Sequence, residues 1–296
     1  MATKAAVSRQ RWLAPEVVQT SAMDCGPAAL KCLLEGFHIP VSYDRLREAC
    51  QTDVDGTSID VIEVVANQLG VQADQVMLPL DYLALPQART LPAIVVVRQA
   101  DGANHFVVVW RRVGRWLQVM DPAVGRRWVP AHRFLQDVFV HSLTVPATDW
   151  RQWAGSDDFT TPLRAQLGLA GVDGKTADGL LARCDADPLW FSYAALDASS
   201  RFVRSVVRAG GLSEGAQAAQ LIVALFEQTL AKPDDIFRII APVYWSAQAD
   251  HLNEEGRLEL LLRGAVMRAL SLQARLLWSP PPRAPRRSWL ARLGWL

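Results

Sequence analysis

The segment at residues 19–30 has the sequence QTSAMDCGPAAL, in which a glutamine stands six positions before a cysteine. Small and apolar residues follow Cys25 directly and continue at helical spacing. This pattern predicts a helix over residues 25–34 that begins at the cysteine, with Asp24 as its N-cap and Gly36 as the glycine that ends it.

Two interpretations of Cys25 follow from its place at a helix start. The free backbone N–H groups of a first turn stabilise a thiolate, which is the nucleophilic form of cysteine. A cysteine on a helix of alanines and leucines is also typical of an apolar core. A nucleophile needs a base within hydrogen-bond reach, so the rest of the chain must decide between the two.

Residues 15–147 show helical patterns first and strand patterns afterwards. Two more helices are predicted, one capped by Ser42 and one opened by Thr57 or Ser58 and ended by Gly70. Segments rich in β-branched residues follow, separated by turn residues; they are residues 71–78, 93–97, 104–110, 116–120 and 127–129. Helices followed by an antiparallel sheet indicate an α+β fold class.

A base and a residue to orient it are found on the predicted strands. His105 begins one strand, and a tight turn at Gly114 leads the next strand back to Asp121 at the same edge of the hairpin. His105 can then face Cys25 while Asp121 accepts a hydrogen bond from its other nitrogen. The side-chain amide of Gln19 and the backbone N–H of Cys25 are natural donors to a tetrahedral oxyanion.

Three motifs in this region resemble, in order and spacing, the bacteriocin-processing cysteine peptidase family. They are Gln19-x-x-x-x-Asp24-Cys25-Gly26, His105-Phe106-Val107-Val108-Val109 and Asp121-Pro122. Members are papain-like domains that stand at the N-termini of peptidase-containing ABC transporters or alone, and the resemblance covers about residues 13–145. It implies a papain-like fold with Cys25 as nucleophile, His105 as general base and acid, Asp121 as orienting residue and Gln19 as oxyanion donor.

The resemblance also implies a substrate, partners and a location. Such domains cleave the leader from a precursor peptide after a double-glycine-type motif, on the cytoplasmic side of the membrane and coupled to peptide export. The expected partners are a precursor with a Gly-Gly-type leader and the membrane and ATPase components of an ABC transporter. Neither a cofactor nor a metal is expected.

Two other functions remain open on the sequence alone. A peptidase-like module that does not cleave would bind and tether an export substrate for a transporter; the family's non-catalytic relatives lack the cysteine, whereas Cys25 is present here. An acyl transferase of the transglutaminase type would use the same residues with an amine as the acceptor.

Composition divides the chain into five parts. They are a loose basic lead-in (1–14), the papain-like domain (15–147), a linker (148–158), an all-α accessory domain (159–278) and a proline-rich, basic, tryptophan-bearing tail (279–296). Apolar residues at helical spacing predict the helices of the accessory domain, most clearly over residues 254–278. The tail is typical of a helix in peripheral contact with a membrane or of a solvated terminus.

Composition and spacing argue against several other classes of protein. The net charge of +1 gives no support to a nucleic-acid partner, and four cysteines without a CxxC pair argue against a zinc site or a disulfide framework. No segment reaches the roughly 18 uncharged apolar residues of a membrane span. Residues 171–176 (GVDGKT) lack the first glycine of a phosphate loop and predict a helix-capping loop. The histidines without partners at ligand spacing are interpreted as surface or core residues; they are His38, His132, His141 and His251.

Overall fold

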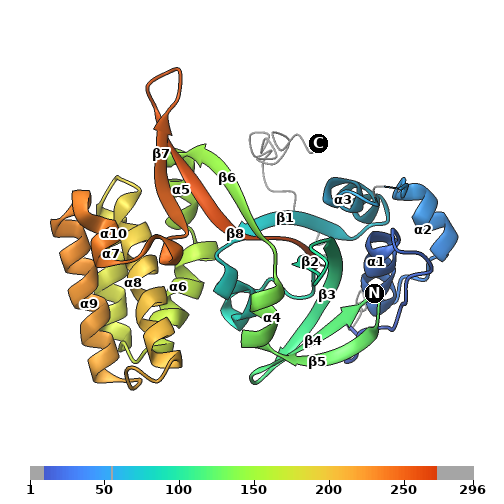
Figure 1. The fold of residues 1–296 in the computed structure, drawn as a ribbon, viewed down its shortest axis with the longest axis horizontal. Helices are drawn as coiled ribbons and strands as arrows, with labels where there is room; N and C mark the ends of the chain where they lie inside the picture. The colour runs from blue at the N-terminus through green and yellow to red at the C-terminus, as the bar shows by residue number, and fades with distance from the viewer. Residues whose placement is uncertain (1–9, 55, 272–296) are drawn as a thin grey trace, which may run out of the picture.

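The N-terminal helices form where the apolar spacing places them. The structure is a computed structural model, which describes residues 10–54 and 56–271. Helices α1 (Cys25–Gly36), α2 (Tyr43–Ala49) and α3 (Ile59–Gln68) lie together at one end of the molecule (Figure 1). Ser58 caps α3 by accepting a hydrogen bond of 3.2 Å from the Val61 N–H, as the sequence predicts.

Helix α1 begins at Cys25, as the sequence predicts, but the residues at its two ends differ from the prediction in detail. Gly36 is the last residue of the helix rather than a residue beyond it, and a Cβ there would lie 2.0 Å from the Trp110 ring. Glycine at this position therefore allows the helix to approach the sheet. Asp24 is the N-cap residue, as predicted, and its carbonyl accepts a hydrogen bond of 3.1 Å from the Ala28 N–H, but its side chain makes no capping hydrogen bond.

Within residues 10–54 and 56–271, the central sheet has eight strands, and every described pair in it is antiparallel. The strands are β1 (Gln72–Leu78), β2 (Ala93–Arg98), β3 (Asn104–Val113), β4 (Trp116–Asp121), β5 (Gly125–Pro130), β6 (Val140–Pro146), β7 (Ala247–Leu252) and β8 (Leu258–Ser271). Their order is β1-β8-β2-β3-β4-β5, with β6 and β7 paired to β8 as well. The five strands predicted before residue 130 are all present, and the α+β organisation of this part is confirmed.

Strand alternation divides the buried residues of the sheet between two apolar cores. Val108 and Trp110 of β3 belong to the core beneath α1, together with Leu30 of that helix. Val107 and Val109 belong to the second core, which is continuous with the helices at the other end of the molecule. The sheet therefore connects the N-terminal helices to the second group of helices.

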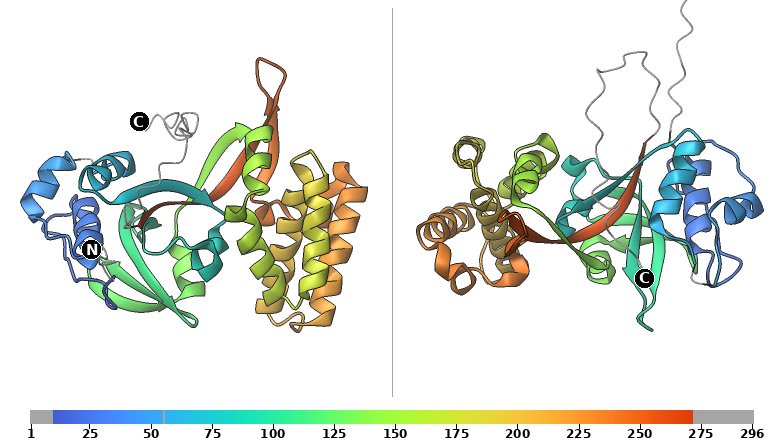
Figure 2. Two further views of the ribbon diagram at one scale, coloured as in Figure 1. Left: turned by 180° about the vertical axis from the view of Figure 1, so that it is seen from behind. Right: turned by 90° about the horizontal axis from the view of Figure 1, so that it is seen from above.

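The second group of helices follows β6 without an extended linker. Short elements η1 (Leu80–Ala84), η2 (Pro86–Ala88) and α4 (Ala131–Asp137) adjoin the sheet, and the group itself comprises α5 (Ala147–Ala154), α6 (Asp157–Leu169), α7 (Gly174–Ala186), α8 (Phe191–Arg208), α9 (Ala216–Ala231), η3 (Pro233–Asp235), α10 (Ile236–Ile239) and η4 (Pro242–Tyr244). The segment predicted as a linker, 148–158, lies largely in α5, where Trp150 is buried in the second core. Figure 2 shows this group beside the sheet from two further directions.

The helix predicted over residues 254–278 is wrong where the structure describes it. Residues 258–271 form strand β8, which crosses the sheet and pairs with β1, β2, β6 and β7. Leucine, alanine and arginine favour a helix locally, but pairing with four strands outweighs that preference. Gly264 allows the crossing, because a Cβ there would lie 2.2 Å from the Leu78 carbonyl oxygen.

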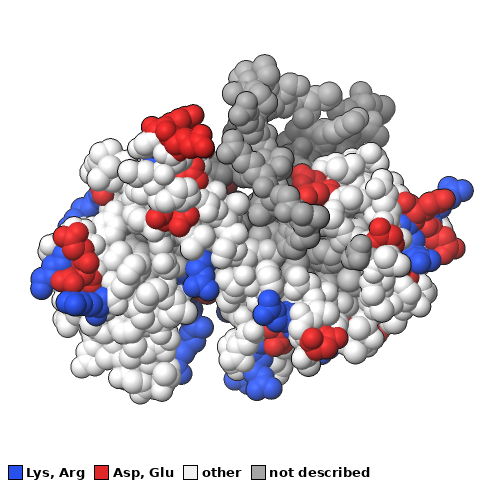
Figure 3. Space-filling view, turned by 45° about the horizontal axis from the view of Figure 1, so that its top comes forward, with Lys and Arg blue, Asp and Glu red and all other residues white. Residues whose placement is uncertain are grey.

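The region after residue 158 is thus not all-α. Strands β7 and β8 form an arm that projects from the sheet (Figure 1). The tail predicted over residues 279–296 lies outside the described residues, as do residues 1–9 of the lead-in. Within the described ranges, no helix combines the length and apolar character that crossing a membrane requires. On the face drawn in Figure 3, the described basic and acidic side chains form small groups of both signs.

Candidate active site

Cys25 is the first residue of α1, and its side chain is half-buried, whereas Cys32, Cys50 and Cys184 are buried. The next residue, Gly26, lies against the loop before α3, since a Cβ on it would come within 2.8 Å of Thr57. Close packing of this loop on the helix start fixes the surroundings of the thiol. Burial raises the pKa values of the other three thiols, to about 11 for Cys50 and about 12 for Cys184, so those cysteines are core residues.

His105 connects the cysteine to a carboxylate. It lies near the start of β3, is 5 % exposed, and its Nε2 is 2.8 Å from Asp121 Oδ1 at the end of β4. The Cys25 side chain is the second group beside the imidazole, and its proximity raises the pKa of His105. Because Nε2 is occupied by Asp121, the ring nitrogen left for the thiol is Nδ1.

Electrostatics favour the protonated imidazole. Burial lowers the pKa of His105, but the hydrogen bonds and charges of Asp121 and Cys25 outweigh it and raise that pKa to about 9. Burial likewise tends to raise the pKa of Asp121, whereas its hydrogen bonds with His105 and the Ala123 N–H, and the charge of Arg127, hold it below the ordinary value. The pair is therefore imidazolium and carboxylate at neutral pH.

Two further groups hold Asp121 in place, and the sequence patterns did not single them out. The Ala123 N–H donates to Asp121 Oδ1 at 2.9 Å, and Arg127 Nη2 donates to Asp121 Oδ2 at 3.0 Å. Arg127 comes from β5, opposite Val119 of β4. Only the register of these two strands places its side chain beside the carboxylate, and register cannot be read from residues 125–130 alone.

Gln19 lies next to this series of contacts. Its backbone N–H donates to the Pro122 carbonyl at 2.9 Å, which fixes the glutamine beside the residue that follows Asp121. Its side-chain Oε1 is buried and has no hydrogen-bond partner among the described residues. This unpaired oxygen is an acceptor, which can receive a hydrogen bond from a bound substrate, whereas the atom of the same side chain that would donate to an oxyanion is Nε2.

Asp24 has partners other than the helix that it precedes. Its Oδ2 accepts a hydrogen bond of 2.7 Å from the Thr20 hydroxyl, and its Oδ1 accepts one of 2.7 Å from Arg47 Nε on α2. Its side chain is fully buried. The carboxylate thus joins the 19–24 segment to α2.

The remaining motifs take structural roles. Asp173 caps α7 by accepting from the Thr176 N–H at 3.0 Å, which confirms the helix-capping loop at residues 171–176. His141 is buried, which lowers its pKa to about 4, and its ring meets Phe139 edge-on. Within the described ranges, no three histidine, cysteine or acidic side chains are grouped as metal ligands.

Sequence comparison identifies the first half of the chain. Residues 14–143 match the sequence model of the Peptidase C39 family. The lactococcin-G-processing and transport ATP-binding protein LagD of Lactococcus lactis is 30% identical over 110 residues, which are 37% of this chain and 16% of LagD. The pediocin PA-1 transport/processing ATP-binding protein PedD of Pediococcus acidilactici is 30% identical over 113 residues, 38% of this chain and 16% of PedD. The matched region therefore spans about a sixth of each of these two relatives.

A shorter relative is matched over most of its length. An uncharacterised protein of Methanothermobacter marburgensis is 33% identical over 117 residues, which are 39% of this chain and 78% of that protein. Among solved structures, a double glycine motif protease from an AMS/PCAT transporter, in complex with the leader peptide, is 26% identical; the match covers 45% of this chain and 90% of that one, with a TM-score of 0.39. From the family model and the M. marburgensis relative it follows that this chain belongs to the Peptidase C39 family.

Proposed function

We propose that the chain is a cysteine endopeptidase that removes the leader from a precursor peptide after a double-glycine-type motif. The observation that carries this proposal is the placement of Cys25 beside His105, which is itself hydrogen-bonded to Asp121. A thiol at a helix start, a buried imidazole and a carboxylate that orients the imidazole are the groups that thiol catalysis requires. Membership of the Peptidase C39 family supports the same chemistry.

The proposed reaction proceeds through a thioester. His105 holds the proton of the thiol, and the Cys25 thiolate attacks the scissile carbonyl carbon to form a tetrahedral oxyanion. The backbone N–H of Cys25 and the Gln19 amide donate hydrogen bonds to that oxyanion. As the C–N bond breaks, the imidazolium gives its proton to the leaving amine; water, deprotonated by His105, then hydrolyses the thioester and restores the thiol.

The identity of the substrate rests on relatives. LagD and PedD carry processing and transport in their names, and a structural neighbour is a double glycine motif protease bound to a leader peptide. We extend the proposal to coupling with peptide export by an ABC transporter, at the cytoplasmic face of the membrane.

The test is cleavage of a synthetic precursor whose amphipathic leader ends in Gly-Gly. The wild-type chain should release the leader, and Cys25→Ala should abolish release while its circular dichroism and melting temperature stay unchanged. Cleavage by Cys25→Ala at the wild-type rate would refute the proposal.

The same assay separates the two alternatives. A tethering module would bind the precursor with similar affinity in wild type and Cys25→Ala and yield no product. An acyl transferase would join the leader to an added primary amine in preference to water, which mass spectrometry detects as an amide product.

A further inference from the structure

A buried carboxylate stands directly before the proposed nucleophile, yet neither the helix nor the proposed reaction uses it. Asp24 is fully buried, and its side chain makes no capping hydrogen bond to α1. A buried charge requires partners, because an unpaired carboxylate in the interior is strongly destabilising. Its partners therefore indicate what the residue does.

Those partners come from two segments, the one that precedes α1 and helix α2. On one side, Thr20 donates its hydroxyl proton to Asp24 Oδ2 at 2.7 Å. On the other, Arg47 donates from Nε to Asp24 Oδ1 at 2.7 Å. Burial tends to raise the pKa of Asp24, but hydrogen bonds from Thr20, Ser21 and Arg47 outweigh it and keep that pKa below its ordinary value. The carboxylate is therefore charged at neutral pH and accepts these hydrogen bonds at full strength.

Thr20 is the neighbour of Gln19, and this makes the contact relevant to the reaction. The Gln19 N–H is bound to the Pro122 carbonyl, and the Thr20 N–H lies 3.4 Å from the Tyr43 hydroxyl of α2. The backbone on both sides of the Gln19 side chain is thus attached to fixed elements. The Thr20–Asp24 bond is the attachment that ends at the residue preceding Cys25, so it sets the position of the 19–20 segment relative to the thiol.

We propose that Asp24 is a positioning residue, which holds the Gln19 segment against the start of α1 so that the Gln19 amide stays at the oxyanion site. This inference rests on the proposed function. The hydrogen bond from Arg47 attaches the Asp24 carboxylate to α2. The hydrogen bond from Thr20 attaches the same carboxylate to the residue that follows Gln19. Asp24 acts through Gln19 and does not itself touch the reacting atoms.

The first experiment removes only the contact between Asp24 and the segment. Thr20→Val keeps the shape of threonine and deletes its hydroxyl, whereas Thr20→Ser keeps the hydroxyl. Since a lost oxyanion donor costs about 10²–10³ in rate, a displaced one should lower kcat for the Gly-Gly precursor roughly tenfold to hundredfold, with KM changed less than about twofold. Thr20→Ser should retain most of kcat, and Asp24→Asn should resemble Thr20→Val.

A double-mutant cycle shows whether the effect passes through Gln19. If it does, Thr20→Val should change kcat by less than about twofold in a Gln19→Ala background, because the donor is already absent. An equal fold-loss in both backgrounds would overturn the proposal. So would a change in the pH dependence of Cys25 alkylation by iodoacetamide in Thr20→Val, because alkylation depends on the thiolate and needs no oxyanion donor.

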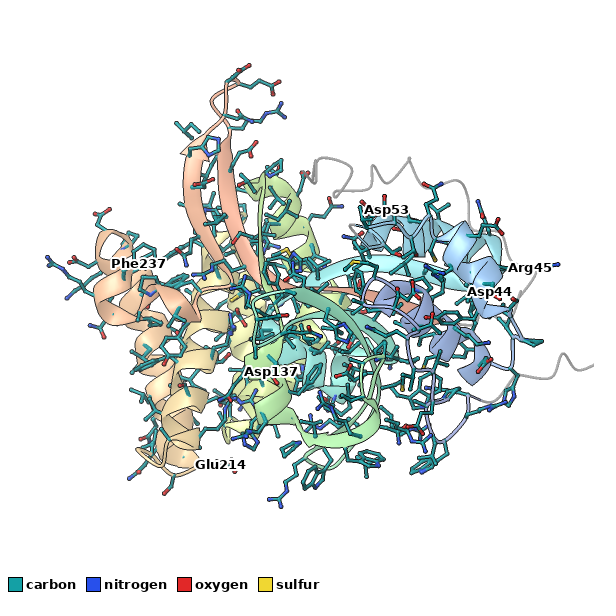
Figure 4. All side chains as sticks on the ribbon, turned by 45° about the vertical axis from the view of Figure 1, so that its right-hand side comes forward. Asp44, Arg45, Asp53, Asp137, Glu214 and Phe237 are labelled. Carbon is teal, nitrogen blue, oxygen red and sulfur yellow. The ribbon has the colours of Figure 1, made fainter. Side chains whose placement is uncertain are left out.

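Matched variants control for general damage. Thr144 of β6 is an exposed threonine whose hydroxyl donates to Asp250 at 3.3 Å, and Thr144→Val should leave kcat unchanged. Arg45 extends from α2 into solvent (Figure 4), so Arg45→Gln should also leave kcat unchanged, whereas Arg47→Gln should lower kcat.

Hydrogen exchange separates failure of this inference from failure of the proposed function. Thr20→Val should speed hydrogen exchange at the Gln19 backbone N–H, which donates to the Pro122 carbonyl in the wild type. This measurement needs no substrate, so it tests the holding role even in a protein that cleaves nothing. Unchanged exchange together with unchanged kcat would refute the inference while wild-type cleavage leaves the proposed function standing.

Discussion

His105 determines the pH range over which the proposed reaction can run. Its pKa of about 9 means that the imidazolium persists through neutral pH and loses its proton as the pH rises through about 9. A thiolate–imidazolium pair supplies the leaving-group proton only while the imidazole is charged, so activity should fall above that pH. The alkaline limb of the kcat/KM profile therefore reports on this residue.

Asp121→Asn should move that limb to lower pH. The carboxylate is the contact that does most to raise the pKa of His105, and an amide at the same place carries no charge. Arg127→Gln should move the limb the other way, because it removes a positive charge from beside Asp121 and leaves the imidazolium more strongly held. The measurement is kcat/KM against pH for the three proteins, and shifts in the same direction for both variants would contradict this account.

At the scale of elements, the approach of α1 to the sheet depends on Gly36. Gly36→Ala would bring a Cβ to 2.0 Å from the Trp110 ring, so the helix or the tryptophan must move. Overpacking of this kind costs about 1–3 kcal/mol in the free energy of unfolding, measurable by urea denaturation. Gly168→Ala in α6 is the control: nothing lies within 4 Å of its Cβ, and helix propensity should make it neutral or stabilising by up to about 1 kcal/mol. If Gly36→Ala and Gly168→Ala changed the free energy of unfolding equally, helix propensity and not contact with Trp110 would explain the effect of Gly36→Ala.

Elements built on short-range patterns could be predicted from the sequence, and elements built on distant pairing could not. Helix α3 has a cap, an apolar face and a terminal glycine within residues 58–70, so its signal is complete locally. Strand β8 carries helix-favouring residues, and its state is decided by β1, β2, β6 and β7, which are distant in sequence. Gly264 and the turn at Gly256, which has a φ of +71°, were the available local signals of a hairpin.

The residues of the candidate site differ in the same way, because some are predictable from local patterns and others depend on contacts between distant parts of the chain. Cys25, His105 and Asp121 each lie at or near the end of an element, and the order of their motifs predicts that their side chains lie together. Arg127 depends on strand register, and the role of Asp24 depends on a contact with α2 across 23 residues of sequence. Contacts of that kind appear only once the chain is folded.

At the scale of the whole molecule, β8 joins the two halves of the chain. It lies between β1 and β2, although it follows the family match at residues 14–143 by more than a hundred residues. We propose that the peptidase unit consists of residues 15–147 together with β8. A chain ending at residue 147 should therefore unfold at lower urea concentration than a chain ending at residue 271, and the β1 and β2 amides should exchange faster. Equal stability of the two would show that β8 is dispensable to the sheet.

The two halves also meet at a buried carboxylate. Asp197 of α8 accepts hydrogen bonds from the Ser246 and Tyr82 hydroxyls at 2.6 and 3.3 Å, and Arg201 Nη1 lies 3.9 Å away. Burial raises the pKa of Asp197 to about 6. The folded state therefore holds this proton more tightly than the unfolded state, and stability should fall as the pH rises from about 4 to about 6. In Asp197→Asn that decline, followed by urea unfolding against pH, should shrink; an unchanged decline would place its origin elsewhere.

The central claim is that Cys25 is the nucleophile of a leader peptidase, and the most direct measurement is to trap the acyl-enzyme. The full chain is mixed with the Gly-Gly precursor, quenched in acid within the first turnover and analysed by peptide-resolved mass spectrometry. The account predicts a leader attached through a thioester to Cys25, with its C-terminal glycine as the acyl group, and no such adduct in Cys25→Ala. Release of the leader by wild-type protein with no adduct on Cys25, or with the adduct on another residue, would contradict it.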